Sequence, residues 1–426
     1  MDERDMISSL PDCLIHLIMS FLTAQEAVQT CVLSKRWKNL WTTLPFLDFD
    51  LYKFEYGGKS DDSEWGDDEL ERIKFEKFRD LVSTTLVLRE GSDLHTLRVS
   101  LDDWKNDVHK YDMIIRSWIL YALKHNLQVL NIDFQLVASL PLGVFTCASL
   151  VDASLDYPNA LNHIKVINLP CLRRLYLHGG KLNQDSVDKL FCGCPVLEFL
   201  HLEYCCEESF IINSQSLKYL KVHCVSGRIE TKNLMELINT PNLLSFCCEI
   251  SPETIGRKIV NGHKMLLKMP ILSSAHISLD LHYKVKGMLM GLSNVQNLTF
   301  SGRGIKDLLE NDLLKYPEFS NLKNLNVKDF CLCHHFNLLA SFLNHCLILE
   351  KLSLEYLGCQ CGAQVQVLGK QKSLKIAPFK GKQLKIVEVQ FVEHDQDFPR
   401  FVKYLQEIAR NSSAQINMTR ISLSWP

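Results

Sequence analysis

The chain has 426 residues, of which 46% are hydrophobic and 23% are charged; 47 basic against 49 acidic residues leave a formal charge of −2. This composition is typical of a folded globular protein and excludes a disordered or collagen-like chain. It also excludes a general positive field, so we expect no nucleic-acid or membrane partner.

The start of the chain carries no membrane or export signal that we recognise. The apolar run from Leu14 to Leu22 is interrupted by His16 and Ser20 and falls far short of the roughly 20 residues that cross a bilayer. The opening MDERD is acidic, whereas a secretory signal begins with basic residues. We therefore expect an intracellular protein with reduced cysteines and no disulfide framework.

Three short helical patterns occupy the first fifty residues. Pro11 takes a position favoured at the start of a helix, and an apolar stripe follows at Leu14, Leu17, Ile18, Phe21 and Leu22. The second pattern begins at Thr23, with Glu26 at the capping-box spacing, and the third contains Trp37 and Trp41 one turn apart. So small a unit needs a neighbour or a partner, and a helical cap on the rest of the chain is one interpretation.

An acidic stretch follows between Glu55 and Glu71. Its composition predicts a solvated, flexible segment, with a partner-binding acidic strip as the alternative. The next stretch, Arg72 to Leu88, is predicted to be a joining helix that packs on the first repeat through Ile73, Phe75, Phe78, Leu81 and Val82.

One short template recurs along most of the remaining chain. Its clear copies begin at Leu94 (LHTLRV), Leu127, Leu172, Leu197, Leu217, Val295, Leu322, Leu349 and Leu384, and weaker copies begin at Leu150, Leu243 and Leu272. Most copies are separated by 20 to 29 residues, close to the period of leucine-rich repeats. The pattern therefore predicts a repeat protein.

Each copy reads as a short strand whose fourth and sixth residues point inward. One repeat cannot bury that face alone, so stacked copies predict a curved solenoid with parallel strands inside and helices outside. The segments NQDSVDKLFCGCP (183–195) and TKNLMELIN (231–239) carry apolar residues at helical spacing and are predicted to be two of the outer helices.

The third, fifth and seventh residues of each copy are expected to line the concave face. Three consecutive copies place aromatic and long polar side chains there, which are enriched in binding hot spots. The candidate target-binding residues are Arg174, Tyr176, His178, Phe199, His201, Glu203, Tyr219, Lys221 and His223. An ordinary solvated sheet face of mixed polarity is the alternative.

Motifs for bond chemistry are mostly missing. Gly58-Lys59-Ser60 ends like a phosphate-binding loop, but Lys53 stands where that motif requires a glycine, and no GxSxG, HExxH or C-x2-C pattern occurs. Cysteines and histidines cluster at Cys331, Cys333, His334, His335, His345 and Cys346, with spacings that differ from known zinc fingers. We interpret these residues, and Cys205 and Cys224, as structural packing, and expect no enzyme, metal or cofactor.

The first fifty residues resemble the F-box of plant proteins, from SSLPDCL through VLSKRW to the closing LW. The resemblance implies a three-helix F-box that docks on a Skp-type adaptor, which bridges to a cullin ubiquitin ligase. It assigns adaptor contacts to the residues at the motif positions: Leu10, Pro11, Leu14, Ile15, Ile18, Leu22, Val32, Leu33 and Trp37. For Leu17 and Phe21 we expect an intramolecular core position instead.

The end of the chain, from LKIVEV onward, is similar to the FBD-type tail of plant F-box and leucine-rich-repeat proteins, with a strand, a helix and a last strand. The helix should bury Phe398, Phe401, Val402, Leu405 and Ile408 and cap the solenoid. The expected α/β architecture is thus an F-box (1–48), an acidic linker with a joining helix (49–93), a curved leucine-rich-repeat solenoid (94–372) and an FBD-like capping tail (373–426).

The resemblance implies a non-catalytic substrate-recognition subunit of an SCF-type ubiquitin ligase, located in the nucleus or cytoplasm. Its expected partners are a Skp-type adaptor, a cullin reached through it, and an unidentified target protein. Two alternatives are a leucine-rich-repeat scaffold without ubiquitin transfer and a small-molecule receptor. The second would need a basic pocket, for which Arg173, Arg174, Lys221 and Arg228 are the candidates.

Overall fold

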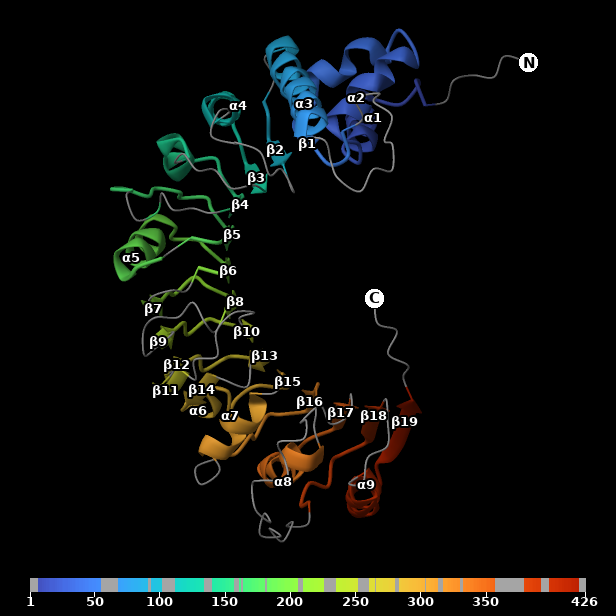
Figure 1. Ribbon diagram of the computed structural model, residues 1–426, viewed down its shortest axis with the longest axis vertical. Coiled ribbons are helices and arrows are strands. Elements are labelled where there is room, and N and C mark those ends of the chain that lie inside the picture. The colour runs from blue at the N-terminus through green and yellow to red at the C-terminus, as the bar shows by residue number, and fades with distance from the viewer. Residues whose placement is uncertain are drawn as a thin grey trace, which may run out of the picture. The chain divides into compact units, whose positions relative to one another are not determined.

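The structure is a computed structural model of the chain (Figure 1). It describes residues 7–54, 68–90, 93–101, 112–133, 140–156, 161, 164–180, 182–205, 210–225, 235–251, 260–264, 266–279, 283–302, 304–312, 317–329, 332–356, 379–391 and 398–420. The chain forms two compact units, residues 1–181 with 188–197 and residues 182–187 with 198–426. Among the described residues, no helix is both long and apolar enough to cross a membrane.

The first unit opens with short helices. These helices are α1 (Asp12–Met19), α2 (Ala24–Gln29) and the 3-10 helices η1 (Thr30–Val32) and η2 (Trp37–Thr43). Strand β1 (Phe46–Asp50) and helix α3 (Asp68–Leu88) follow. The predicted capping box is confirmed, because the Thr23 hydroxyl accepts from the Glu26 amide while the Glu26 carboxylate accepts from the Thr23 amide at 2.8 Å. The third predicted helix is a 3-10 helix rather than an α-helix.

Five parallel strands form the sheet of the first unit. They alternate with helices in the order β2 (Thr96–Ser100), α4 (Asp112–Leu123), β3 (Val129–Asp133), η4 (Leu142–Thr146), β4 (Asp152–Asp156) and β5 (Arg174–His178). Strands β1 to β5 pair in chain order without register shifts. Helix α5 (Gln184–Gly193) confirms the helix predicted over 183–195, and the Asn183 side chain caps it by accepting from the Ser186 amide at 2.9 Å.

The main sheet of the second unit is again parallel. Its strands are β6 (Phe199–Glu203), β8 (Tyr219–Val225), β10 (Ser245–Ser251), β13 (Ser274–Leu279), β15 (Asn297–Ser301), β16 (Asn324–Val327), β17 (Lys351–Tyr356), β18 (Ile386–Phe391) and β19 (Gln415–Arg420), paired in that order. Its helices are α6 (Met288–Gly291), α7 (Ile305–Asp312), α8 (Leu332–Leu343) and α9 (Phe398–Ser412). In Figure 1, α8 and α9 lie on the same side of the strands.

The repeat template predicts these strands correctly. Each of its twelve copies contains a strand of the main sheet, and the leading residue of each copy is buried, as for Leu94 and Leu217 at 0% exposure. The fourth and sixth residues are buried too, for example Leu220 and Val222 in β8. Period-2 alternation therefore fixes which side of each strand faces the core.

One predicted outer helix is wrong. The segment 231–239 contains strand β9 (Met235–Asn239), which pairs with β7 (Phe210–Asn213) and β12 (Leu266–Lys268) in a separate small sheet. A second small sheet pairs β11 (Val260–Lys264) with β14 (Tyr283–Lys286). A short apolar run does not distinguish the helical period from the strand period, and here lateral pairing with two neighbours satisfies the backbone.

The joining helix and the tail agree with prediction. In α3, Phe75, Phe78 and Val82 are buried, while Ile73 and Leu81 are half-buried. The strand–helix–strand tail forms as β18, α9 and β19, and α9 buries three of its predicted residues together with Tyr404: Phe401, Leu405 and Ile408. Val402 is only half-buried, and the Phe398 side chain lies outside the described residues.

Because α9 packs through so few large side chains, we expect Phe401→Ala to destabilise the tail by about 3–5 kcal/mol, as large-to-small changes at buried aromatic positions do. Lys403→Ala, on the exposed side of the same helix, should change stability by less than about 0.5 kcal/mol. Denaturant unfolding followed by hydrogen exchange in α9 and β19 measures both. Equal effects of the two changes would show that α9 does not cap the sheet by burial.

Candidate functional site

The first candidate site is the surface of the N-terminal helices, which rests on a small core. Five buried residues form this core: Ile15, Met19, Ala27, Trp37 and Leu44. Leu10, Leu22, Leu40, Trp41 and Phe46 pack against it while partly exposed. The indole Nε1 of Trp37 donates to the Ser8 hydroxyl at 3.1 Å, so the polar edge of this buried ring is satisfied.

Helix α1 has a second apolar face that the chain leaves in solvent. Leu14, Leu17 and Ile18 are 43%, 56% and 43% exposed, and Phe21 just after the helix is 84% exposed. The prediction that Leu17 and Phe21 lie in the core is wrong. Ile15 and Met19, one turn apart, take the core positions, because they face Trp37 while the i, i+3, i+4, i+7 stripe faces outward.

The nine residues assigned to adaptor contacts fall into three groups. Pro11, Leu14, Ile18, Val32 and Leu33 are exposed, Leu10 and Leu22 are half-buried, and Ile15 and Trp37 are buried. In this structure the side chains of Ile15 and Trp37 belong to the core on which the exposed residues rest. Val32, the last residue of η1, and Leu33 after it are 83% and 64% exposed, so these large apolar side chains are also left in solvent. We call Leu14, Leu17, Ile18, Phe21, Val32 and Leu33 the F-box patch, after the plant F-box that this segment resembles.

Polar contacts tie the segment after η1 to the start of α1. The Arg36 guanidinium donates to the Asp12 carboxylate at 2.7 Å and to the Ser8 carbonyl, and the Ser34 and Ser8 hydroxyls are 3.2 Å apart. Both ends of the Arg36–Asp12 pair are partly exposed, so its net contribution to stability is small. Its effect is to hold Ser34 and Arg36 near the N-terminal end of α1.

The N-terminal helices are also joined directly to the first repeat. Strand β1 pairs with β2 over five residues. The buried Arg89 guanidinium donates to the Leu44 carbonyl, and the Glu90 amide donates to the Thr42 carbonyl at 3.2 Å. Burial lowers the pKa of Arg89. The F-box patch and strands β2 to β5 thus belong to one packed unit.

The second candidate site is the open face, by which we mean the side of each main sheet that carries the third, fifth and seventh template residues. In the first unit it bears Arg174, Tyr176 and His178, which are exposed or half-buried as predicted. Arg174 pairs with Asp152 at 2.8 Å, and His178 pairs with Asp156 at 2.6 Å. Arg174 and His178 are therefore each engaged by a carboxylate on the neighbouring strand.

In the second unit the open face is more aromatic. The rings of Phe199 and Tyr219 are adjacent, with centroids 6.4 Å apart, and Tyr219 is 44% exposed. His223 contacts the Glu203 carboxylate at 3.3 Å and the Ser251 hydroxyl at 2.7 Å. Lys221 lies 3.6 Å from Glu249. All six predicted residues of β6 and β8 are on this face and none is fully buried.

The basic pocket that a small anionic ligand would need has little support, because Arg174 and Lys221 are each paired with a carboxylate. Each already faces a carboxylate on a neighbouring strand. Arg228, another candidate for that pocket, lies outside the described residues, and Arg173 is an exposed residue just before β5. The described part of the chain brings no cluster of unneutralised cations together at these predicted positions.

One group on the open face escaped the sequence reasoning. Cys247 and Glu249 of β10 and His276 of β13 present their thiol, carboxylate and imidazole atoms within 4.8 Å of one another. Burial raises the pKa of the Cys247 thiol to about 12 and lowers the pKa of His276. The signal was present in the template, because Cys247 and His276 both occupy its fifth position and Glu249 occupies its seventh.

The cysteine and histidine cluster near residue 331 is only partly described. Cys331 and the side chains of Cys333, His334 and His335 lie outside the described residues. Cys346 is buried and its thiol contacts the Phe342 carbonyl at 3.4 Å, as expected for packing. Cys205 and Cys224, at 0% and 1% exposure, confirm the predicted small buried positions at strand ends.

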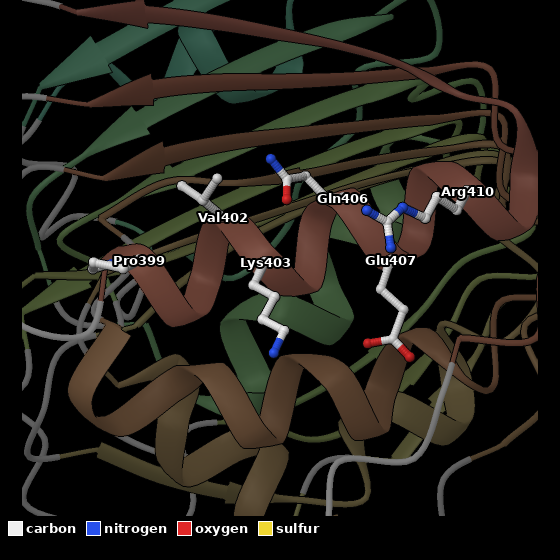
Figure 2. A pocket seen from close by; sticks show the side chains of 6 residues that line it. All are labelled: Pro399, Val402, Lys403, Gln406, Glu407 and Arg410. Atoms are coloured by element: carbon white, nitrogen blue, oxygen red, sulfur yellow. The ribbon is translucent and has the colours of Figure 1, made fainter.

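A hollow of about 770 Å³ is lined by residues of α9 (Figure 2). It is lined by Pro399, Val402, Lys403, Gln406, Glu407 and Arg410. Figure 2 shows Lys403 and Glu407 pointing to the opposite side of α9 from Val402 and Gln406. The lining mixes two cations, one carboxylate and aliphatic carbon, so it is not matched to one ligand chemistry.

Two protein families match this chain. Residues 7–49 match the F-box domain, and residues 115–258 match the leucine-rich repeats described for FBD-associated F-box protein At5g56370. The first match contains α1, α2, η1, η2 and nearly all of β1, and the second covers repeats in both units. These matches confirm the resemblance inferred from the motif and the template.

Similar proteins come from Arabidopsis thaliana. The F-box/FBD/LRR-repeat protein At5g22660 is 29% identical over 83% of this chain and 77% of its own length, and the FBD-associated F-box protein At1g60410 is 28% identical over 83% and 84%. The candidate F-box protein At1g58310 is 33% identical over 57% of this chain. This chain spans half the length of that last relative.

The open face yields a prediction for His201. Burial lowers the pKa of this imidazole, with Lys221 acting in the same direction and Glu203 opposing it. An unfolded histidine has a pKa of about 6.5, so below that pH the unfolded chain binds the proton more readily. The stabilisation from neutral His201 is complete above pH 6.5 and declines as the pH falls towards the folded pKa.

Imidazole NMR titration, assigned with His201→Gln, should give a pKa below 6.5 for His201. The same variant should lose less stability than the wild type between pH 7.5 and pH 5.5. A His201 pKa at or above 6.5 would contradict the burial seen in β6.

Proposed function

Because the chain carries an F-box and leucine-rich repeats of the FBD-associated F-box class, we propose that it is a substrate-recognition subunit of an SCF-type cullin ubiquitin ligase. Proteins that combine these two parts generally have this role, and F-box domains generally bind Skp-type adaptors. The observation that carries the proposal is the F-box patch, a group of large apolar side chains left in solvent by a small unit.

The F-box patch supports adaptor docking on energetic grounds. Exposed apolar side chains that gather on one surface mark interaction sites more often than single ones do. Each Leu, Ile or Phe buried by a partner would contribute about 1.5–3 kcal/mol. Helix α1 offers Leu14, Leu17 and Ile18 in the i, i+3, i+4 arrangement that fits a complementary apolar groove. A cullin would then be reached through the adaptor.

The proposed role of the repeats is to bind the target protein through the open face. Phe199, Tyr219 and Lys221 are the strongest candidates in the second unit, since aromatic side chains dominate binding hot spots. This chain would supply proximity and no bond chemistry. Holding a target lysine near the activated ubiquitin raises its effective concentration there.

The alternative function is that of a scaffold or ligand receptor without ubiquitin coupling. A decayed F-box that merely capped the first repeat would have no reason to keep Phe21 at 84% and Val32 at 83% exposure. The ion pairs of Arg174 and Lys221 disfavour an anionic ligand on the open face. For the ligase function we propose a location in the nucleus or cytoplasm.

Adaptor docking is tested by Leu14→Ala combined with Leu33→Ala. Loss of two hot-spot contacts of about 2 kcal/mol each should abolish co-purification with a Skp-type adaptor and cullin. The fold should persist, because both side chains are exposed. Met113→Ala, at a 77% exposed apolar position on α4, is the matched control and should bind like the wild type. A folded wild-type chain that captures neither protein would favour the scaffold.

Target binding is tested by Tyr219→Ala combined with Lys221→Ala. The change should stop ubiquitination of a target that the wild-type chain ubiquitinates in a reconstituted ligase, while adaptor co-purification stays intact. Met290→Ala, at a 59% exposed position on α6, serves as the control. Unchanged target ubiquitination in the double variant would place target recognition elsewhere on the chain.

A further inference from the structure

The group Cys247, Glu249 and His276 is assembled by strand register. Strands β10 and β13 are parallel neighbours, and Cys247 lies directly opposite His276. Glu249 is two residues further along β10, so its side chain emerges on the same face. Neighbouring strands are about 4.8 Å apart, which brings the three side chains together without a special loop. The arrangement is part of the sheet and does not require the chain to move.

The distances suit a single ion. The thiol, carboxylate and imidazole atoms all lie within 4.8 Å of one another, and the Cys247 Sγ is 3.3 Å from a Glu249 oxygen. A tetrahedral zinc ion with bond lengths of about 2.0–2.3 Å holds its ligands roughly 3.5 Å apart. The observed separations of the three ligand atoms exceed this spacing by at most about 1.3 Å.

The donor types select the metal. Thiolate sulfur, imidazole nitrogen and carboxylate oxygen are the ligands of Zn²⁺, whereas Mg²⁺ and Ca²⁺ take oxygen ligands. We propose that Cys247, Glu249 and His276 form a Zn²⁺ site on the open face of the second unit. The site supplies three protein ligands, and a water molecule would complete the tetrahedron. The proposal is independent of the proposed ligase function.

The surroundings of the three ligands fit this use. The His276 Nε2 already contacts the Ser301 hydroxyl at 3.1 Å, which leaves Nδ1 for the ion and supplies the outer hydrogen bond that orients a ligating histidine. Lys221 balances the Glu249 carboxylate at 3.6 Å in the chain without metal. A bound Zn²⁺ would replace that cation, and its charge would match one thiolate and one carboxylate.

The test uses Co²⁺ as a spectroscopic probe in the purified, fully reduced chain. Binding should give thiolate-to-cobalt charge-transfer absorption and tetrahedral ligand-field bands at one equivalent, and Zn²⁺ should displace both. Cys247→Ser should remove the charge-transfer band. His276→Asn and Glu249→Gln should each weaken Zn²⁺ binding at least roughly 10–100-fold, the loss expected even from outer-shell changes.

Two controls separate this site from other cysteines. Cys192→Ser alters an exposed thiol on α5 and should leave the spectrum unchanged. Cys333→Ser should also leave it unchanged, and loss of the bands in this variant with retention in Cys247→Ser would overturn the proposal in favour of the cluster near residue 331. Denaturation without metal checks that each variant is folded. Absence of a cobalt–thiolate band in the folded wild type overturns the proposal outright.

Discussion

The structure depends on one constraint: a repeat of this size has a strand with two faces and can bury only one of them. Burial of alternate residues against the next repeat fixes the inner face, as Leu220 and Val222 show in β8. The intervening residues are then forced onto the open face, whatever their chemistry. In-register parallel pairing lines up equivalent positions of neighbouring repeats, which is how Cys247 and His276 meet as a group.

The same limit operates in the N-terminal helices, but with the opposite result. About forty residues provide a core of only a few large side chains, centred on Trp37 and Ile15. Helix α1 and the turn after it carry more apolar residues than that core can accept, so Leu17 and Phe21 stay in solvent. A face that the chain itself cannot bury is costly in water unless a partner covers it. Small size therefore links the stability of this unit to association.

Sequence reasoning reached the repeat strands and the tail because their signal is periodic and independent of what surrounds them. Prediction from the sequence failed where tertiary contacts decide the type of an element or the direction in which its side chains face. The run 231–239 is too short to reveal its period, and pairing with β7 and β12 made it a strand. The orientation of α1 depended on which of its two apolar faces meets Trp37. The Cys247 group required aligning degraded copies of the template, where the repeat signal is weakest.

The joint between the F-box and the repeats has consequences for how a receptor subunit would work. Strand β1 lies within a few residues of η2 and pairs in register with β2, so the acidic stretch, most of which lies outside the described residues, is not the sole link. A flexible linker would spread a tethered target over a large volume and dilute it near the ligase. Here the sheet begins with β1 in the F-box and continues with β2 in the first repeat, so backbone pairing removes the freedom that a flexible linker would give.

The buried contact of Arg89 with the Leu44 carbonyl reinforces the joint, since separating the two parts would leave a desolvated guanidinium without this partner. Rigid attachment of the first repeats to the F-box patch is thus a property of backbone pairing, and substitutions on the open face leave that pairing undisturbed.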